Sequence, residues 1–412
     1  MRWDRRLYWY DYSHVSPLTL VKHVPILDEF SFEWLGIVAV RVLDAVANRS
    51  ELELSDRYRA HHTSKHKLLT ELLSIGESSI FEIKNLVMQT LRFDGRFGGR
   101  FGASTNPAKT VTEYADLFRA FGLPPIAKDF TDDLGFAHKR VGGPNPVMLR
   151  RLKIQDERLP ITDAMFQVAA PHDLLDAALS EGRLYLADYA LLDGAELSSF
   201  PNGQKYLYAP LALFVIDRTT KDLRPVAIQC RQTPAADNPI FTPNDGYNWL
   251  IAKTIVETAD GNIHEASTHL GRTHLAMEPF VVSSYRQLAA NHPLSILLWP
   301  HFEGTLAINK AAGQHLIAEK GGIDKLMGGS IKTSCGVAVQ DVQSLRVMSD
   351  LLPLSFAQRG VEDRESLSRV SVSRRCDLVL GCDPRLGQRV LAAVLRERHR
   401  HPARHGTASV GS

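Results

Sequence analysis

The sequence predicts a mainly α-helical protein with a small antiparallel β element. Three long segments, 31–50, 66–93 and 248–293, carry apolar residues at helical spacing. Residues 205–229 instead contain two runs rich in β-branched and aromatic residues around the polar turn TTKD, which is the pattern of a short hairpin. We therefore expect helices over most of the chain, including most of residues 1–92, and a small antiparallel sheet.

The composition is ordinary for a soluble globular protein. Of 412 residues, 44% are hydrophobic and 23% are charged, and the net charge of +2 gives no electrostatic reason to expect a nucleic-acid partner. No apolar run of 18 residues predicts a membrane span, and the start MRWDRRLYWYDYSH lacks the apolar core of a signal peptide. Four cysteines without C-x-x-C spacing are compatible with a reduced compartment. We expect a cytoplasmic protein, and a signal lost upstream would make it periplasmic or secreted.

Several short motifs have simpler structural interpretations. HHTSKH (61–66) and GRFGGRFG (95–102) resemble a metal cluster and an RGG segment, but a basic loop and a glycine loop explain them better. GGPNP (142–146) predicts a rigid turn. Pro279 lies inside a helical pattern, where it removes a backbone donor and should kink or end the helix.

The segment HEASTHLGRTHLAMEPF (264–280) places histidines at 264, 269 and 274, each five residues apart. A zinc-hydrolase helix needs two histidines four apart, so a zinc hydrolase that uses His264 and Glu265 is disfavoured by the spacing. A π-bulge would return residue i+5 to the face of residue i, and such bulges favour functional sites. Two interpretations stay open here: structural histidines of a polar helix, or ligands of a metal other than helical zinc.

Taken together, these segments resemble the catalytic domain of a lipoxygenase. KRVGGPNPVMLRRL, EGRLYLADY, KYLYAPLALF, HEASTHLGRTHLAMEPF, HPLSILLWPHFEGTLAIN and QRGVED follow one another in the family's order between residues 130 and 369. The amino-terminal β-sandwich of plant and animal members is not apparent, as in bacterial members. We expect a partial lipoxygenase-like catalytic domain over 1–369 and a non-homologous, disordered basic tail over 370–412.

The resemblance implies an oxidoreductase that uses non-haem iron and O2 to convert polyunsaturated fatty acids with a 1,4-pentadiene into hydroperoxides. It implies that His269 and His274 bind the iron and take part in catalysis. It also implies that His264 and Glu265 orient these ligands without binding the iron themselves. Ala312 and Leu316 fall where the family lines its substrate channel. His292 and His301 match histidines outside the iron shell. Peripheral contact with a membrane is compatible with such a substrate.

The sequence departs from the family pattern after residue 369. The family's remaining iron ligands lie far beyond the second histidine, and the tail supplies none at matching positions. Residues 370–376, VSVSRRC, can be back-translated so that the next frame reads Tyr-Pro-Tyr-Arg-Asp-Asp, as the family would continue. The expectation is a frameshift near codon 370 and an incomplete, weakly binding iron site. The alternative function is a catalytically dead lipid-binding or interaction fragment of the same fold.

Overall fold

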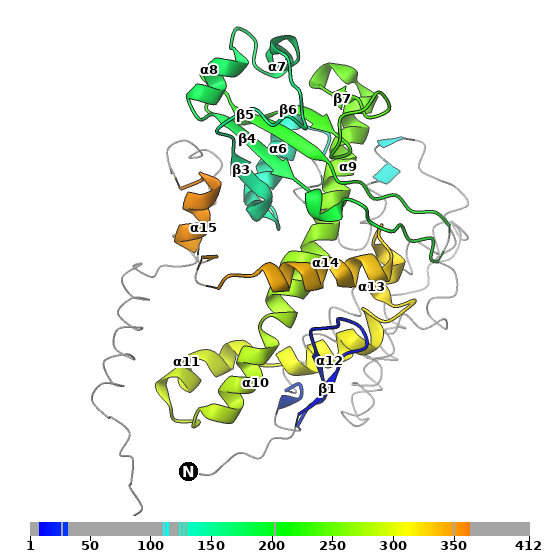
Figure 1. Ribbon diagram of the computed structural model, residues 1–412, viewed down its shortest axis with the longest axis vertical. Coiled ribbons are helices and arrows are strands. Elements are labelled where there is room, and N and C mark those ends of the chain that lie inside the picture. Colours follow the sequence, from blue (N-terminus) through cyan, green and yellow to red (C-terminus); the bar gives the residue numbers. More distant parts are fainter. Residues whose placement is uncertain are drawn as a thin grey trace, which may run out of the picture.

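The structure of the protein, a computed structural model, combines a five-stranded antiparallel sheet with a set of helices at one end of it (Figure 1). It describes residues 8–25, 28–31, 110–111, 113–114, 123–124, 127, 130–201, 203–347, 349–350 and 352–362. The motifs at 61–66 and 95–102, and the proposed change of frame with the tail at 370–412, lie outside these residues.

The strands are β1 (Trp9–Asp11), β2 (Leu20–His23), β3 (Leu149–Arg151), β4 (Leu184–Asp188), β5 (Leu211–Ile216), β6 (Leu223–Gln229) and β7 (Ile240–Phe241). The α-helices are α6 (Asp133–Gly142), α7 (Asp163–Ala169), α8 (Leu175–Ser180), α9 (Tyr247–Ile263), α10 (Glu278–Gln287), α11 (Pro293–Phe302), α12 (Thr305–His315), α13 (Gly322–Leu326), α14 (Ile331–Ser344) and α15 (Leu352–Arg359). Short 3-10 turns are η3 (Pro146–Met148), η4 (Ala190–Leu192) and η5 (Pro243–Asp245), and η6 (His264–Leu275) is a π-helix.

The sheet has the order β3-β4-β5-β6-β7, with every neighbouring pair antiparallel. Strands β5 and β6 form the hairpin predicted from residues 205–229. The turn between them is held by the Asp217 carboxylate, which accepts hydrogen bonds from the backbone N–H groups of Thr219 and Thr220. The small antiparallel element expected from the sequence is therefore confirmed, and it is larger than one hairpin.

Both faces of the sheet are covered, so its strands are buried on both sides. Side chains alternate along a strand: Tyr185 and Ala187 of β4 pack in the cluster that contains residues of α6 and α9. Leu184 and Leu186 pack in the cluster on the other face, with residues of α7 and α8.

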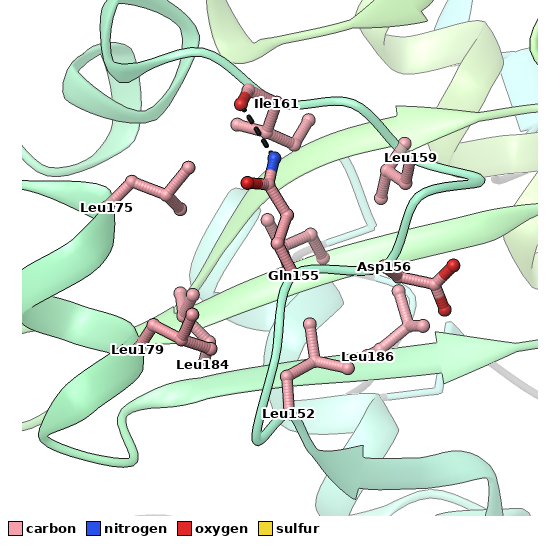
Figure 2. Close-up of a pocket in the computed structure, with 10 residues that line it drawn as sticks. Leu152, Gln155, Asp156, Leu159, Ile161, Leu175, Leu179, Leu184 and Leu186 are labelled. Atoms are coloured by element: carbon pink, nitrogen blue, oxygen red, sulfur yellow. Dashed lines mark hydrogen bonds between the residues drawn. The ribbon is translucent and has the colours of Figure 1, made fainter.

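Figure 2 shows a small cavity in the cluster of α7 and α8, lined mostly by leucines. Its volume is about 10 Å³, which is room for roughly one water molecule. Gln155 crosses it and donates a hydrogen bond to the carbonyl of Ile161. The cavity lies on the face of the sheet away from α9, and it is far too small for a fatty acyl chain.

The helical segments expected at 31–50 and 66–93 lie, apart from Ser31, outside the residues that the structure describes. The described part of residues 1–92 is not α-helical. Residues 9–23 contain a two-stranded antiparallel hairpin, β1 and β2, with Tyr10 opposite Val21. Leu20 and Val21 are both buried, and Leu20 contributes to a cluster with residues of the π-helix, of α14 and of the segment that follows α12. The packing of these two adjacent apolar residues against the rest of the protein therefore determines that this segment is a strand. A strand of four residues is too short for helical periodicity to predict its conformation.

From Tyr247 the chain runs as one long rod through α9 into the π-helix, and α10 to α12 follow as a separate layer (Figure 1). The rod ends at Ala276 and Met277, and α10 begins with Glu278 and Pro279 in its first turn. Pro279 thus ends one helix and starts the next, as its missing N–H predicts. Within the described ranges, no helix has the length and apolarity required to span a bilayer.

Candidate metal centre

The three histidines spaced five apart lie on a π-helix of 12 residues, η6. In the wider turn of a π-helix, residue i+5 lies on the same face as residue i, whereas in an α-helix it does not. Histidines five residues apart can therefore share one face. Hydroxyl groups help to hold the wide turns. The Thr273 hydroxyl donates to the carbonyl of Thr268, five residues earlier, at 2.9 Å. The predicted bulge is therefore confirmed, and it extends over the whole histidine segment.

The π-helix is held against α14 by an ion pair and a close backbone approach. Arg272 makes two hydrogen bonds to the Asp341 carboxylate, Nε to Oδ2 at 2.8 Å and Nη2 to Oδ1 at 2.9 Å. A Cβ at Gly271 would lie 3.3 Å from the carbonyl oxygen of Ala338, so glycine allows the two helices to approach this closely. The wide turns are therefore held by contacts with α14 as well as by hydrogen bonds within the π-helix.

His269 and His274 bring their Nε2 atoms to 3.1 Å from each other. The ring centroids lie 4.8 Å apart with the planes at 69°. The ring of His264 stacks on His269 with centroids 5.8 Å apart, and its Nδ1 lies 3.2 Å from the Thr268 hydroxyl oxygen. Of the three histidines, the structure therefore pairs His269 and His274 through their Nε2 atoms and places His264 behind that pair.

The Nδ1 atom of His269 faces the carboxylate of Glu265, with Oε2 at 3.1 Å. A carboxylate only accepts, so Nδ1 of His269 donates and its Nε2 is left to face His274. The hydrogen bond to Glu265 raises the pKa of His269 above its ordinary value. The same bond holds the pKa of the Glu265 carboxyl below its usual range.

The Nδ1 atom of His274 faces the side chain of Asn309 on α12, with Oδ1 at 2.7 Å. Asn309 Nδ2 donates to Oε2 of Glu278 at 2.7 Å, so Oδ1 is the oxygen that accepts from His274. Burial lowers the pKa of His274. In its neutral form, which burial favours, His274 carries its proton on Nδ1 and has a lone pair on Nε2.

Glu278 lies behind Asn309 and is buried, with 2% of its surface exposed. Its second oxygen, Oε1, accepts from the backbone N–H of Val21 in β2 at 2.6 Å. Burial raises the pKa of Glu278 to about 7. The ligand face of His274 is thus connected to the amino-terminal hairpin through two buried side chains.

These partners direct the two Nε2 atoms toward each other, so that the atoms can share a proton or bind one metal ion together. Two lone pairs at 3.1 Å repel each other unless a proton or a metal ion is shared. Two imidazole nitrogens that each bind one metal at about 2.1 Å and at right angles to each other lie about 3.0 Å apart. The separation of the two Nε2 atoms fits that geometry. Within the described residues, no set of three or more His, Cys, Asp or Glu side chains converges on a metal-sized site, so the pair could supply two ligands there.

The other residues singled out in the sequence lie at the start of α11, in α11, in α12 and directly after α12. Ala312 is half-buried on α12, one turn after Asn309, and Leu316 follows that helix and packs against the cluster that includes Leu20 and Leu270. His292 caps α11, where its Nδ1 accepts from the backbone N–H of Leu294. The structure brings neither His292 nor His301 to the histidine pair.

Asn309 and Glu278 are the site residues that the sequence analysis missed. Each is a polar residue in an apolar run, LAIN and LAMEPFVV, and each is nearly completely buried. A polar side chain among apolar neighbours is the signal that could have drawn attention to them, because buried polar groups need partners.

Comparison with known proteins gives the family. Residues 109–373 match the Lipoxygenase family model. The linoleate 9/13-lipoxygenase of Pseudomonas aeruginosa is 34% identical over 322 residues, which cover 76% of this chain and 45% of that protein. The polyunsaturated fatty acid lipoxygenase ALOX15B of Rattus norvegicus is 38% identical over 260 residues, which cover 62% and 38%.

Solved structures agree with these sequence matches. A calcium-dependent 11R-lipoxygenase aligns with a TM-score of 0.69 and 25% identity, over 88% of this chain and 48% of that one. The chain thus spans about half the length of the relatives that it matches, or less. The chain belongs to the lipoxygenase family.

Proposed function

We propose that this chain carries the iron-binding histidine helix of an enzyme that oxygenates polyunsaturated fatty acids. The observation that supports the proposal most strongly is the 3.1 Å separation of the Nε2 atoms of His269 and His274. Family membership implies a non-haem metal, and a pair of neutral imidazoles suits iron among the metals that nitrogen ligands bind. When bound, the iron would supply a one-electron oxidant for the bis-allylic carbon of the pentadiene.

In this proposal the residues of the chain position the metal and shield the substrate. Glu265 and Asn309 hold the two rings by their Nδ1 atoms, which keeps both Nε2 atoms directed at the metal. Ala312 and Leu316 on the side of α12 would contact the pentadiene. An apolar environment there keeps water away from the substrate radical until O2 adds to one of its ends. The resulting peroxyl radical becomes the hydroperoxide by taking up one proton and one electron, which the reduced metal would return.

A second candidate function is lipid binding without oxygenation. It is favoured by the ligand count within the described residues, since two imidazoles leave most of a metal's coordination positions to water. A lipid-binding chain would need the apolar contacts of α12 and no metal. The two functions therefore differ in the requirement for iron.

The test is oxygen uptake with linoleic acid as substrate. The purified chain, loaded with Fe2+ under anaerobic conditions, is mixed with linoleic acid and O2. Oxygen consumption and the absorbance of the conjugated diene are then recorded together. The proposal expects both signals to rise with Fe2+ and to be lost in His274→Ala. Binding of a fluorescent fatty acid with no oxygen uptake at any iron loading would reject oxygenation and support the lipid-binding function.

A further inference from the structure

We propose that Glu278 and Asn309 are positioning residues that set which nitrogen of His274 carries the proton, and that Val21 of the amino-terminal hairpin anchors them. The proposal rests on the proposed metal site and adds residues outside the expected ligand set. It is argued from three consecutive hydrogen bonds: Val21 N–H to Glu278, Asn309 to Glu278, and His274 to Asn309.

The arrangement is buried from Val21 to Asn309, and His274 at its end is half-buried. Val21 and Asn309 are each 1% exposed and Glu278 is 2% exposed. In such surroundings a mismatched donor or acceptor costs far more than it would in water, because water cannot replace the missing partner. Each group must therefore find a partner of the opposite kind, and the pattern of donors and acceptors becomes rigid.

The direction of the pattern is fixed at its backbone end. The N–H of Val21 can only donate, so it requires an acceptor at Oε1 of Glu278. Above its pKa of about 7, Glu278 is a carboxylate. It then presents a second acceptor, Oε2, to Asn309, so Asn309 turns its NH2 group toward Glu278 and its carbonyl oxygen toward His274. His274 then has to donate from Nδ1. Nε2 of His274 therefore keeps the lone pair that a metal would use, because the carboxylate of Glu278 sets the orientation of Asn309.

His269 has no comparable constraint. Its partner Glu265 is 35% exposed and the histidine itself is 46% exposed, so water can satisfy either group. The bond between them is also a single contact within one helix. The two histidines are therefore held by different means, and a change at Glu278 should act on His274 directly and on His269 only through the contact between their Nε2 atoms.

The Glu278→Gln substitution tests this directly, because an amide has one donor end and one acceptor end. The Val21 N–H keeps its need for an acceptor, so the introduced glutamine must turn its NH2 group toward Asn309. Asn309 then reverses to accept, and its own NH2 group faces Nδ1 of His274. The reversal also gives up the contact from Asn309 Nδ2 to the carbonyl of His274, but at 3.4 Å this is weaker than the 2.6 Å bond from Val21. The proton of His274 moves to Nε2.

The experiment uses the metal-free chain with ¹⁵N-labelled histidine at about pH 8, where Glu278 is ionised, and His274→Gln identifies the signals of His274. Imidazole ¹⁵N shifts report which nitrogen carries the proton. The expected result is Nδ1–H in the wild type and Nε2–H in Glu278→Gln. Glu265→Gln is the matched control, since it makes the same chemical change beside the other histidine and should leave the protonated nitrogen of His274 unchanged.

A Co2+ titration, followed by visible absorption, adds a second readout. Loss of a side chain that orients a ligand typically weakens metal binding by about 10- to 100-fold, and Glu278→Gln should show a loss in that range. Asn309→Ala in the Glu278→Gln background removes the misplaced donor, so the double variant should bind Co2+ more tightly than Glu278→Gln. A purely structural role for Glu278 would instead make the double variant worse than either single one.

The outcomes separate this inference from the proposed function. A folded Glu278→Gln chain in which His274 keeps its proton on Nδ1 overturns the inference, whatever the Co2+ result. If Glu278→Gln does not fold, Asn309→Ala alone decides. It should lose the preference for Nδ1–H, and an unchanged preference overturns the inference. A wild type that binds no Co2+ but shows the expected change of protonated nitrogen would count against the metal site and not against the positioning residues.

Discussion

Nε2 of His269 and Nε2 of His274 lie 3.1 Å apart although five residues separate them in the chain. The π-helix brings the two rings to the same face of the helix. The hydrogen-bond partners of the two Nδ1 atoms orient the rings so that the Nε2 atoms face each other. Three further predictions concern the stability of the elements that hold this pair in place.

The first prediction concerns Gly271, where the π-helix crosses α14. A Cβ there would lie 3.3 Å from the carbonyl oxygen of Ala338 and 3.5 Å from Oδ2 of Asp341. Gly271→Val should therefore force the helices apart and lower the free energy of unfolding by about 1–3 kcal/mol. Urea denaturation measures the change.

Gly336 on α14 is the matched control for Gly271. It is exposed, and a Cβ there meets no atom within 4 Å. Gly336→Val should change the free energy of unfolding by no more than about 0.5 kcal/mol. Equal losses at the two glycines would show that the helix crossing does not require a residue without a side chain.

The second prediction concerns Arg140 of α6, which joins α6 to α9 beneath the sheet. Its guanidinium contacts Glu257 at 2.7 Å, Asp260 at 3.2 Å and the Tyr189 hydroxyl at 2.8 Å, and it is almost fully buried. Arg140→Met leaves Asp260 buried without its cation. The expected loss is about 3–5 kcal/mol of unfolding free energy.

Arg150 offers a control of the same kind for Arg140. It contacts Asp156 at 3.4 Å, but 43% of its side chain is exposed. Arg150→Met should cost about 1 kcal/mol or less, because water screens the pair. A loss at Arg140 as small as the loss at Arg150 would mean that the buried network contributes little to stability.

The third prediction concerns the pH dependence that Glu278 imposes. Burial raises its pKa in the folded chain from 4.5 to about 7, so the folded chain binds this proton more tightly than the unfolded chain. The stabilisation of the folded chain by this proton is fully present below about pH 4.5 and is lost as the pH rises through about 7. A pKa shift of this size corresponds to a change of roughly 3 kcal/mol in the free energy of unfolding.

Denaturation at pH 5 and at pH 8 measures this effect in the wild type and in Glu278→Gln. Glutamine does not titrate, so the difference between the two pH values should be smaller in the variant by an amount approaching 3 kcal/mol. The same pH dependence in both proteins would show that Glu278 is not the group responsible.

The sequence alone predicted the family, the mainly helical fold, the hairpin around TTKD and the wide turn between the histidines. These features depend on local signals: periodicity, turn residues and the spacing of His269 and His274 along one helix. A five-residue spacing restricts the local geometry strongly, since few backbone conformations bring both rings to one face.

The β1–β2 hairpin and the partners of His274 were not predicted. Val21, Glu278 and Asn309 come from three elements, and Val21 is 257 positions from Glu278. Their contacts depend on how these elements pack in three dimensions, about which periodicity within a segment says nothing. Ala312 and Leu316 were named from the resemblance, and their role in a substrate channel stays a prediction.

The central claim of this account is that His269 and His274 hold one metal ion between their Nε2 atoms. A Co2+ titration of the wild type, His269→Ala, His274→Ala and the control His301→Ala tests it most directly. The account predicts that the wild type and His301→Ala each bind one Co2+ per chain with the same affinity. It also predicts a loss of affinity of at least about 10-fold when either paired histidine is removed. Equal Co2+ binding in all four proteins would contradict it.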